Sequence, residues 1–180
     1  MKKIYMMFFA FLCMAFSVQA AKVTDLSQLS NDKLYTIRSE RAFLLYHSNT
    51  LASSNGMTVT GITRNPQDPN QQFRIEKSGS TYLLYSVGAG KYVMVQRENT
   101  VTWNGTRGSN VTITSTGNTA YPWKLKIGNY YINSQDPNQT ATGLVIGSWS
   151  TTDAGNSYII EEVTDDETGG GEGGSSASTD

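Results

Sequence analysis

The chain has 180 residues, of which 16% are charged, and a formal net charge of −1. Between residues 21 and 163, twelve basic residues stand against ten acidic ones, so the chain lacks the dense positive charge with which proteins bind nucleic acids. One cysteine, Cys13, and one histidine, His47, are too few for a zinc site or a disulfide. We therefore expect no nucleic-acid partner, no metal and no other cofactor.

Residues 1–20 have the pattern of a secretory signal peptide. Two lysines precede an apolar run of 13 residues, Ile4 to Phe16, and small residues lead to a cleavage position after Ala20. The run is shorter than the roughly 20 apolar residues that a membrane helix needs. We therefore expect an exported protein, secreted, periplasmic or at the cell surface, with no membrane anchor once the leader is removed.

From Leu34 to Val163 the sequence predicts only β-strands. Apolar and polar residues alternate over short stretches rich in Tyr, Val, Ile and Thr, and Gly, Asn, Ser or Pro interrupts them every few residues. No window keeps a helical period for ten residues. The twelve predicted strands are 34–39, 43–48, 57–62, 71–77, 81–87, 91–96, 100–105, 110–115, 121–127, 130–135, 143–149 and 156–163.

The strands fall into three groups of four, whose anchor residues recur with a period near 43 residues. In each fourth strand two apolar residues are separated by one position, as are Phe73 and Ile75, and so point to the same face. Three units that cannot bury this face alone can close around a common core. The recurring anchors are Tyr35, Tyr82 and Trp123 in the first strands, Phe43, Tyr92 and Tyr130 in the second, and Phe73, Val111 and Tyr158 in the fourth.

The beginning of the fourth strand carries a motif that resembles a known family. The segment Asp68 to Phe73, DPNQQF, is similar to the Asn-Gln-x-Trp segment of ricin-type lectin domains, and weaker copies begin at Asn110 and Asn156. The opening segment, Asp25 to Tyr46, also resembles N-terminal trefoil segments of exported Bacteroidota proteins. The resemblance covers residues 25–163 and implies an all-β fold, the β-trefoil, with three four-stranded repeats and pseudo-threefold symmetry.

The same resemblance implies sugar sites built from an Asp after the first strand, an aromatic residue in the third, and Asn-Gln before the fourth. An aromatic ring stacks on the apolar face of a sugar, while amides and carboxylates bond to its hydroxyls. Each candidate also has a structural interpretation, as a loop-closing amide, a packed ring or a turn residue. The candidate sugar contacts are Asn70 and Gln71 in the first repeat, Trp103 in the second, and Asp136, Trp149, Asp153 and Asn156 in the third.

The carboxylates do not form a catalytic pair. Glu161 and Glu162 are neighbours on one predicted strand and point to opposite faces, whereas glycosidases need two carboxylates that face each other. Residues 164–180 hold five acids and no apolar residue larger than alanine, and we expect them to be a disordered tail or linker. His47 is expected to be a solvated strand residue. We therefore expect no enzymatic activity.

These features favour an exported, non-catalytic, carbohydrate-binding module with a glycan as its partner, accessory in one version of this hypothesis to a linked carbohydrate-active enzyme. Two alternatives stay open. One is a protein-interaction or protease-inhibitor trefoil that docks through the loop at 134–143, and the other is a spacer domain that binds nothing. The sequence Asp-Pro-Asn, which occurs within 67–71 and again within 135–139, is expected to form turns in both places.

Overall fold

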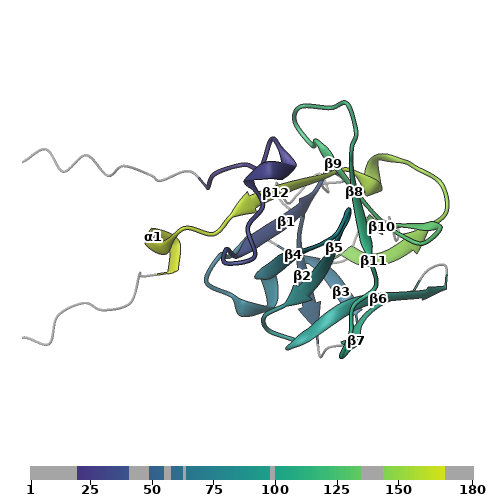
Figure 1. The fold of residues 1–180 in the computed structure, drawn as a ribbon, viewed down its shortest axis with the longest axis horizontal. Helices are drawn as coiled ribbons and strands as arrows, with labels where there is room; N and C mark the ends of the chain where they lie inside the picture. The colour runs from purple at the N-terminus through teal and green to yellow at the C-terminus, as the bar shows by residue number, and fades with distance from the viewer. Residues whose placement is uncertain are drawn as a thin grey trace, which may run out of the picture.

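The structure is a computed structural model that describes residues 20–40, 49–54, 58–62, 64–97, 100–134 and 144–168. Within these ranges the chain is built mainly of antiparallel β-strands, which form a barrel with hairpins packed on it (Figure 1). The elements are η1 (Leu26–Gln28), β1 (Tyr35–Ser39), β2 (Asn49–Ser54), β3 (Thr58–Ile62), η2 (Pro69–Gln71), β4 (Phe73–Ser78), β5 (Thr81–Ser86), β6 (Lys91–Arg97), β7 (Thr100–Gly105), β8 (Val111–Ser115), β9 (Trp123–Ile127), β10 (Tyr130–Ser134), β11 (Leu144–Trp149), η3 (Ala154–Asn156), β12 (Tyr158–Glu162) and α1 (Asp165–Thr168).

Six strands, two from each repeat, form the barrel. The first and fourth strands of a repeat meet at one residue pair, and the fourth strand then pairs along its length with the first strand of the next repeat. The first-to-fourth pairs join the anchor residues that the sequence predicts, so the expected β-trefoil with pseudo-threefold symmetry is confirmed. These pairs are Tyr35 with Phe73, Tyr82 with Val111, and Trp123 with Tyr158.

The second and third strands of each repeat form a hairpin: β2 with β3, β6 with β7, and β10 with β11. Strands β3 and β11 also pair with each other, which joins the first and third hairpins. One residue of each second strand is buried in the core, at 0, 0 and 1% exposure for Leu51, Val93 and Ile132. The three hairpins therefore share the core with the barrel.

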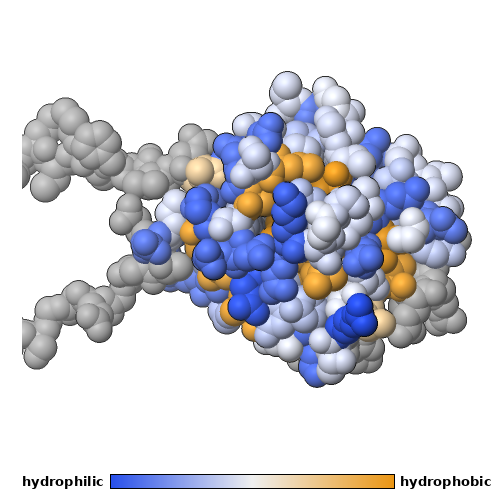
Figure 2. All heavy atoms as spheres, viewed as in Figure 1, coloured by the Kyte–Doolittle hydropathy of each residue, from blue (hydrophilic) through white to orange (hydrophobic). Residues whose placement is uncertain are grey.

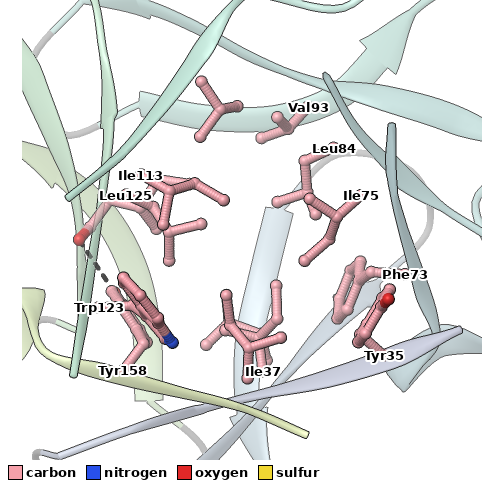
Figure 3. Packing of buried hydrophobic residues seen from close by; sticks show 14 of the residues in the cluster. Tyr35, Ile37, Phe73, Ile75, Leu84, Val93, Ile113, Trp123, Leu125 and Tyr158 are labelled. Carbon is pink, nitrogen blue, oxygen red and sulfur yellow. Dashed lines mark hydrogen bonds between the residues drawn. The ribbon is translucent and has the colours of Figure 1, made fainter. Parts of the chain in front are cut away.

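The core consists of aliphatic and aromatic side chains from the three repeats that meet near the barrel axis (Figure 3). Its aromatic members include Tyr158, whose hydroxyl donates to the Ile132 carbonyl at 2.9 Å, and Trp123, whose indole donates to the Val23 carbonyl at 2.8 Å. Hydrophilic side chains cover most of the face shown in Figure 2. The central pairs across neighbouring strands are Ile37 with Ile160, Ile75 with Leu84, and Ile113 with Leu125.

The second strand of the first repeat is not where the sequence predicts it. Strand β1 pairs with β2 through Arg38 with Thr50 and Ser39 with Asn49, so the strand at this place is Asn49–Ser54. The predicted strand, 43–48 with its anchor Phe43, lies outside the described residues. The pattern FLLYHS is more hydrophobic than NTLASS, but a hairpin strand of this fold needs only one large core residue, which is Leu51.

Residues Asp165–Thr168 form the short helix α1, which is bound to the barrel. The Arg64 guanidinium donates to both carboxylate oxygens of Glu167, at 2.7 and 3.1 Å, and its Nε donates to Thr36 Oγ1 at 3.0 Å. The prediction of disorder from Thr164 onward is therefore wrong for these four residues, because composition alone does not reveal a basic partner so distant in sequence. Residues 169–180 lie outside the described part of the chain. Where the chain is described, no helix is long and apolar enough to cross a membrane.

Candidate functional site

The loops before the fourth strands place Gln71 and Asn156 in equivalent positions, each two residues before the aromatic residue that opens the strand. Both residues are buried, at 1 and 0% exposure. Gln71 Oε1 accepts from the Asn65 amide at 2.7 Å. Asn156 Oδ1 accepts from the Asp153 amide at 2.7 Å, and its Nδ2 donates to the Ile132 carbonyl at 3.2 Å. Both side chains thus close their own loops, and neither is open to a ligand.

Asn70 is exposed and lies in the turn η2. The Asp68 carboxylate accepts from its amide at 2.9 Å, which is the turn chemistry expected of Asp-Pro-Asn. Gly88 of the second repeat lies so close that a Cβ there would be 2.3 Å from Asn70 Oδ1. The third strand of this repeat, Thr58–Ile62, contains no aromatic residue. The first repeat therefore offers an exposed amide without a ring on that strand to stack against a sugar.

The third repeat presents an aromatic pair on the outside of the molecule. Tyr131 of β10 lies opposite Trp149 of β11 and, on its other side, opposite Lys126 of β9. Directly opposed residues of antiparallel strands point to the same face, with Cβ atoms about 4.5–5.5 Å apart. Lys126 Nζ lies 5.1 Å from the centre of the Tyr131 ring. We call Lys126, Tyr131 and Trp149 the repeat-three row.

Trp149 has the exposure expected of a ligand platform rather than of a core residue. It is 38% exposed and is the one large hydrophobic side chain that the described residues expose. Trp123, by comparison, is 6% exposed. An aromatic pair with an open ring on a sheet surface is the geometry that stacking on a flat, partly apolar ligand requires.

A carboxylate is bound to β10, the strand that carries the middle member of the repeat-three row. Asn133 follows Tyr131 by two positions on β10 and points to the same face, but it is only 3% exposed. Its Nδ2 donates to Asp153 Oδ1 at 2.8 Å, and the same oxygen accepts from the Gly155 amide at 2.8 Å. A Cβ at Gly155 would lie 2.5 Å from the Ser134 carbonyl, so only glycine permits this close approach. The third repeat thus holds an orienting carboxylate in the loop that follows the hairpin with the aromatic pair.

The equivalent row of the second repeat is covered by side chains of β5 and β6 and of the neighbouring strand β4. The Arg74 guanidinium lies 4.3 Å from the centre of the Tyr85 ring, and Tyr85 meets Tyr92 edge to face with centroids 5.0 Å apart. The Tyr92 hydroxyl donates to Glu76 Oε2 at 2.9 Å, and this bond to the carboxylate raises the pKa of Tyr92. Gly105 stands where the third repeat has its tryptophan. This cluster stabilises the barrel surface and leaves no open ring comparable to that of the third repeat.

Three of the candidate sugar contacts in the third repeat lie close together in the structure. Trp149 and Asp153 lie in one hairpin and the loop that covers it, and Asn156 closes that loop. Asp136 lies outside the described residues, as does most of the 134–143 loop on which the protein-interaction alternative depends. Trp103 lies in β7 opposite a core residue of β6, but its side chain is outside the described part.

Three residues of this site, Tyr131, Lys126 and Asn133, are not among the sugar contacts that the sequence predicts. Lys126 had a signal, because Leu125 and Ile127 point inward and the position between them on that strand must point outward. Tyr131 lies on the next strand, and its place opposite Trp149 depends on the pairing register of the fold. The contact between Asn133 and Asp153 had no signal in the sequence, because it joins a strand to a loop 20 residues later. Among the described residues, no three His, Cys, Asp or Glu side chains could together hold a metal ion.

No protein-family model matches the chain, and no curated protein matches it. Several solved structures do. A ricin B-like lectin of Macrolepiota procera in complex with lactose has a TM-score of 0.58 at 18% identity, with 74% of this chain and 97% of that chain covered. A designed threefold-symmetric protein, ThreeFoil, has a TM-score of 0.57 at 15% identity, covering 71% and 97%. A Polyporus squamosus lectin bound to a human-type influenza-binding epitope, Neu5Acα2-6Galβ1-4GlcNAc, has a TM-score of 0.54 at 20% identity, covering 74% and 50%. At these identities the likeness shows a shared fold, the β-trefoil.

Proposed function

We propose that the chain is a non-catalytic, lectin-like module that binds a glycan on its third repeat. Trp149 supplies the stacking surface, Tyr131 extends it, and Asp153 accepts hydrogen bonds from sugar hydroxyls. The exposed indole of Trp149 carries this proposal, because a large ring left open on a sheet surface gains its free energy of burial only when a ligand covers it. The lactose and the sialylated epitope bound to the similar lectins support a glycan as that ligand.

Tryptophan fluorescence tests the proposal directly. The purified protein is screened on a glycan array, and each hit is titrated while emission is recorded. We expect the emission to shift on binding, and Trp149→Ala to abolish both the shift and the binding. Trp149→Phe keeps an aromatic platform and should keep weakened binding, which separates the loss of a stacking surface from a general loss of structure.

Two controls make the result decisive. Urea denaturation of both variants shows whether the fold survives, and the exposed position of Trp149 predicts little change in stability. Asn70→Ala removes an exposed amide in the first repeat and should leave binding unchanged. Array-wide failure of the folded protein to bind any glycan would exclude the lectin-like function. Binding that Trp149→Ala leaves intact would exclude the third repeat as its site.

Export of the protein is a further part of the proposal. It is supported by the leader pattern of residues 1–20, and an accessory role beside a carbohydrate-active enzyme is supported only by the resemblance of residues 25–46 to exported trefoil segments. Intact mass spectrometry of the protein recovered from outside the cytoplasm checks the first point. We expect an N-terminus at Ala21, and recovery of the full-length chain from the cytoplasm alone would contradict export.

A further inference from the structure

We propose that the third repeat selects a saccharide that carries an anionic group, whose charge is held by Lys126 and Lys124 beside the Tyr131 and Trp149 rings. This inference rests on the proposed function and adds the class of ligand to it. Carboxylated and sulfated sugars share the required chemistry. The ring would stack on the aromatic pair while the anion extends across β10 toward β9.

The strand geometry places both lysines on the ligand side. In β9 the residues Trp123, Leu125 and Ile127 are buried, so the two lysines between them point outward. Lys126 belongs to the repeat-three row itself, and Lys124 follows on the same face two residues away. A ligand that covers Trp149 and Tyr131 and extends further across β10 toward β9 therefore contacts the ammonium group of Lys126 next.

The two lysines carry positive charge without a carboxylate partner among the described residues. Opposite them on β8 stand Thr112 and Thr114, which are uncharged and exposed. Other basic residues of the barrel are neutralised, as is Arg38, which pairs with Glu161 at 2.8 Å. The absence of a counter-charge leaves Lys126 and Lys124 available to an anion from outside.

The second repeat provides an internal comparison. At the positions equivalent to Lys126 and Lys124 it has Tyr85 and Leu83. At those equivalent to the two threonines, the neighbouring strand β4 of the first repeat has Arg74 and Glu76. Its cation lies on a tyrosine ring, and Glu76 lies 3.5 Å from that cation. The cation beside the second-repeat row thus has a carboxylate nearby, whereas Lys126 and Lys124 have none among the described residues. The two backbones are nevertheless related by the pseudo-threefold axis.

The test is an array that presents neutral oligosaccharides beside carboxylated and sulfated forms of the same backbones. We expect the full chain to prefer the anionic members. Each Lys→Gln substitution, K124Q or K126Q, should weaken that binding about fivefold, as expected for loss of one exposed charge pair. Raising the salt concentration should have the same effect, because screening weakens exposed pairs. Lys126→Arg keeps the charge and should keep the preference, and Lys91→Gln removes an exposed lysine of the second repeat and should change nothing.

The outcomes separate this inference from the proposed function. Equal binding of neutral and anionic members, abolished by Trp149→Ala but unaffected by K126Q, would overturn the anionic preference and leave the lectin-like function standing. No binding to any member would overturn both. Preference for only the carboxylated or only the sulfated members would support the inference and identify which anion the site takes.

Discussion

At the scale of single residues, Gln71 and Asn156 occupy the same position in two repeats, and both stabilise the loop that precedes the fourth strand. In each, a side-chain amide oxygen accepts from a backbone amide of the preceding loop, at 2.7 Å in both cases. Glutamine reaches back six residues and asparagine three, so the longer side chain closes the longer loop. An amide that makes this bond while buried is a structural part of the repeat, and a sugar site must be built from its neighbours.

Gln71→Ala should destabilise the protein by about 1–3 kcal/mol, because the buried loop would lose its acceptor for the Asn65 amide. Urea denaturation measures the change in the free energy of unfolding. Asn70→Ala, one residue earlier but exposed, is the matched control and should change stability by less than about 0.5 kcal/mol. Equal losses in the two variants would show that the hydrogen bond of Gln71 is not the cause.

At the scale of elements, a bidentate ion pair between Arg64 and Glu167 binds the C-terminal helix α1 to the barrel. Arg64 and Glu167 have side chains only 18 and 14% exposed, and their two hydrogen bonds are bidentate. The Thr164 amide also donates to Glu167, at 3.1 Å. The bond to Arg64 is the main reason that the pKa of Glu167 lies below its ordinary value. A helix of four residues has little stability of its own, so contacts such as this one are needed to keep the segment on the barrel.

Glu167→Gln should cost about 1 kcal/mol near neutral pH, because it removes a partly buried ion pair. A carboxyl group whose pKa is lowered in the folded state stabilises the protein above its ordinary pKa, and the contribution is lost as the pH falls through the lowered value. The difference between the wild type and the variant should therefore shrink as the pH falls below the ordinary glutamate pKa of 4.5 and disappear below the lowered pKa of Glu167. Urea denaturation across pH 2.5–7 measures it, with the exposed Asp32→Asn as the control. A difference that grows in acid would contradict the assignment.

Strand β2 shows why sequence predicts some elements and misses others. Strands that contribute two inward residues, such as β4 with Phe73 and Ile75, have an alternating pattern that identifies them. Strand β2 buries Leu51 and otherwise carries small or polar residues, three of which, Thr50, Ala52 and Ser53, are also buried. Backbone pairing and close packing bury these three residues, and neither can be recognised from the hydropathy of the sequence. The site follows the same rule: Trp149 stood out in the sequence, whereas its partner Tyr131 depended on a pairing register visible only in the fold.

Leu51→Ala should cost about 2–5 kcal/mol, because a fully buried side chain of β2 would leave a cavity where the hairpin meets the core. Ile132→Ala removes the equivalent side chain in the third repeat and should cost a similar amount. Leu83→Ala, on the outward face of β5, serves as the control and should cost clearly less. Urea denaturation of the three variants compares them. A small loss for Leu51→Ala alone would show that Asn49–Ser54 does not supply the core residue of the first hairpin.

At the scale of the whole molecule, strand pairs between repeats join the three units into one closed barrel. Each fourth strand pairs along its length with the first strand of the next repeat, and β12 closes the circle by pairing with β1. The apolar anchors could be read from the sequence because the same inward pair recurs three times. The differences between repeats, which determine where a ligand can bind, lie on the outward face. Residues there do not recur from repeat to repeat, so the sequence pattern does not identify them.

The closed arrangement predicts that the three repeats unfold together. Leu84 and Leu125 occupy equivalent places in different repeats, and each contacts the fourth strand of the repeat before it. Leu84→Ala and Leu125→Ala should each lower stability by about 2–5 kcal/mol in one transition with an unchanged m-value. Urea titrations followed in parallel by circular dichroism and by tryptophan emission, to which the buried Trp123 contributes, should give coincident curves. Two separated transitions in either variant would mean that a repeat can unfold while the others stay intact, which the shared core and the closed strand order both oppose.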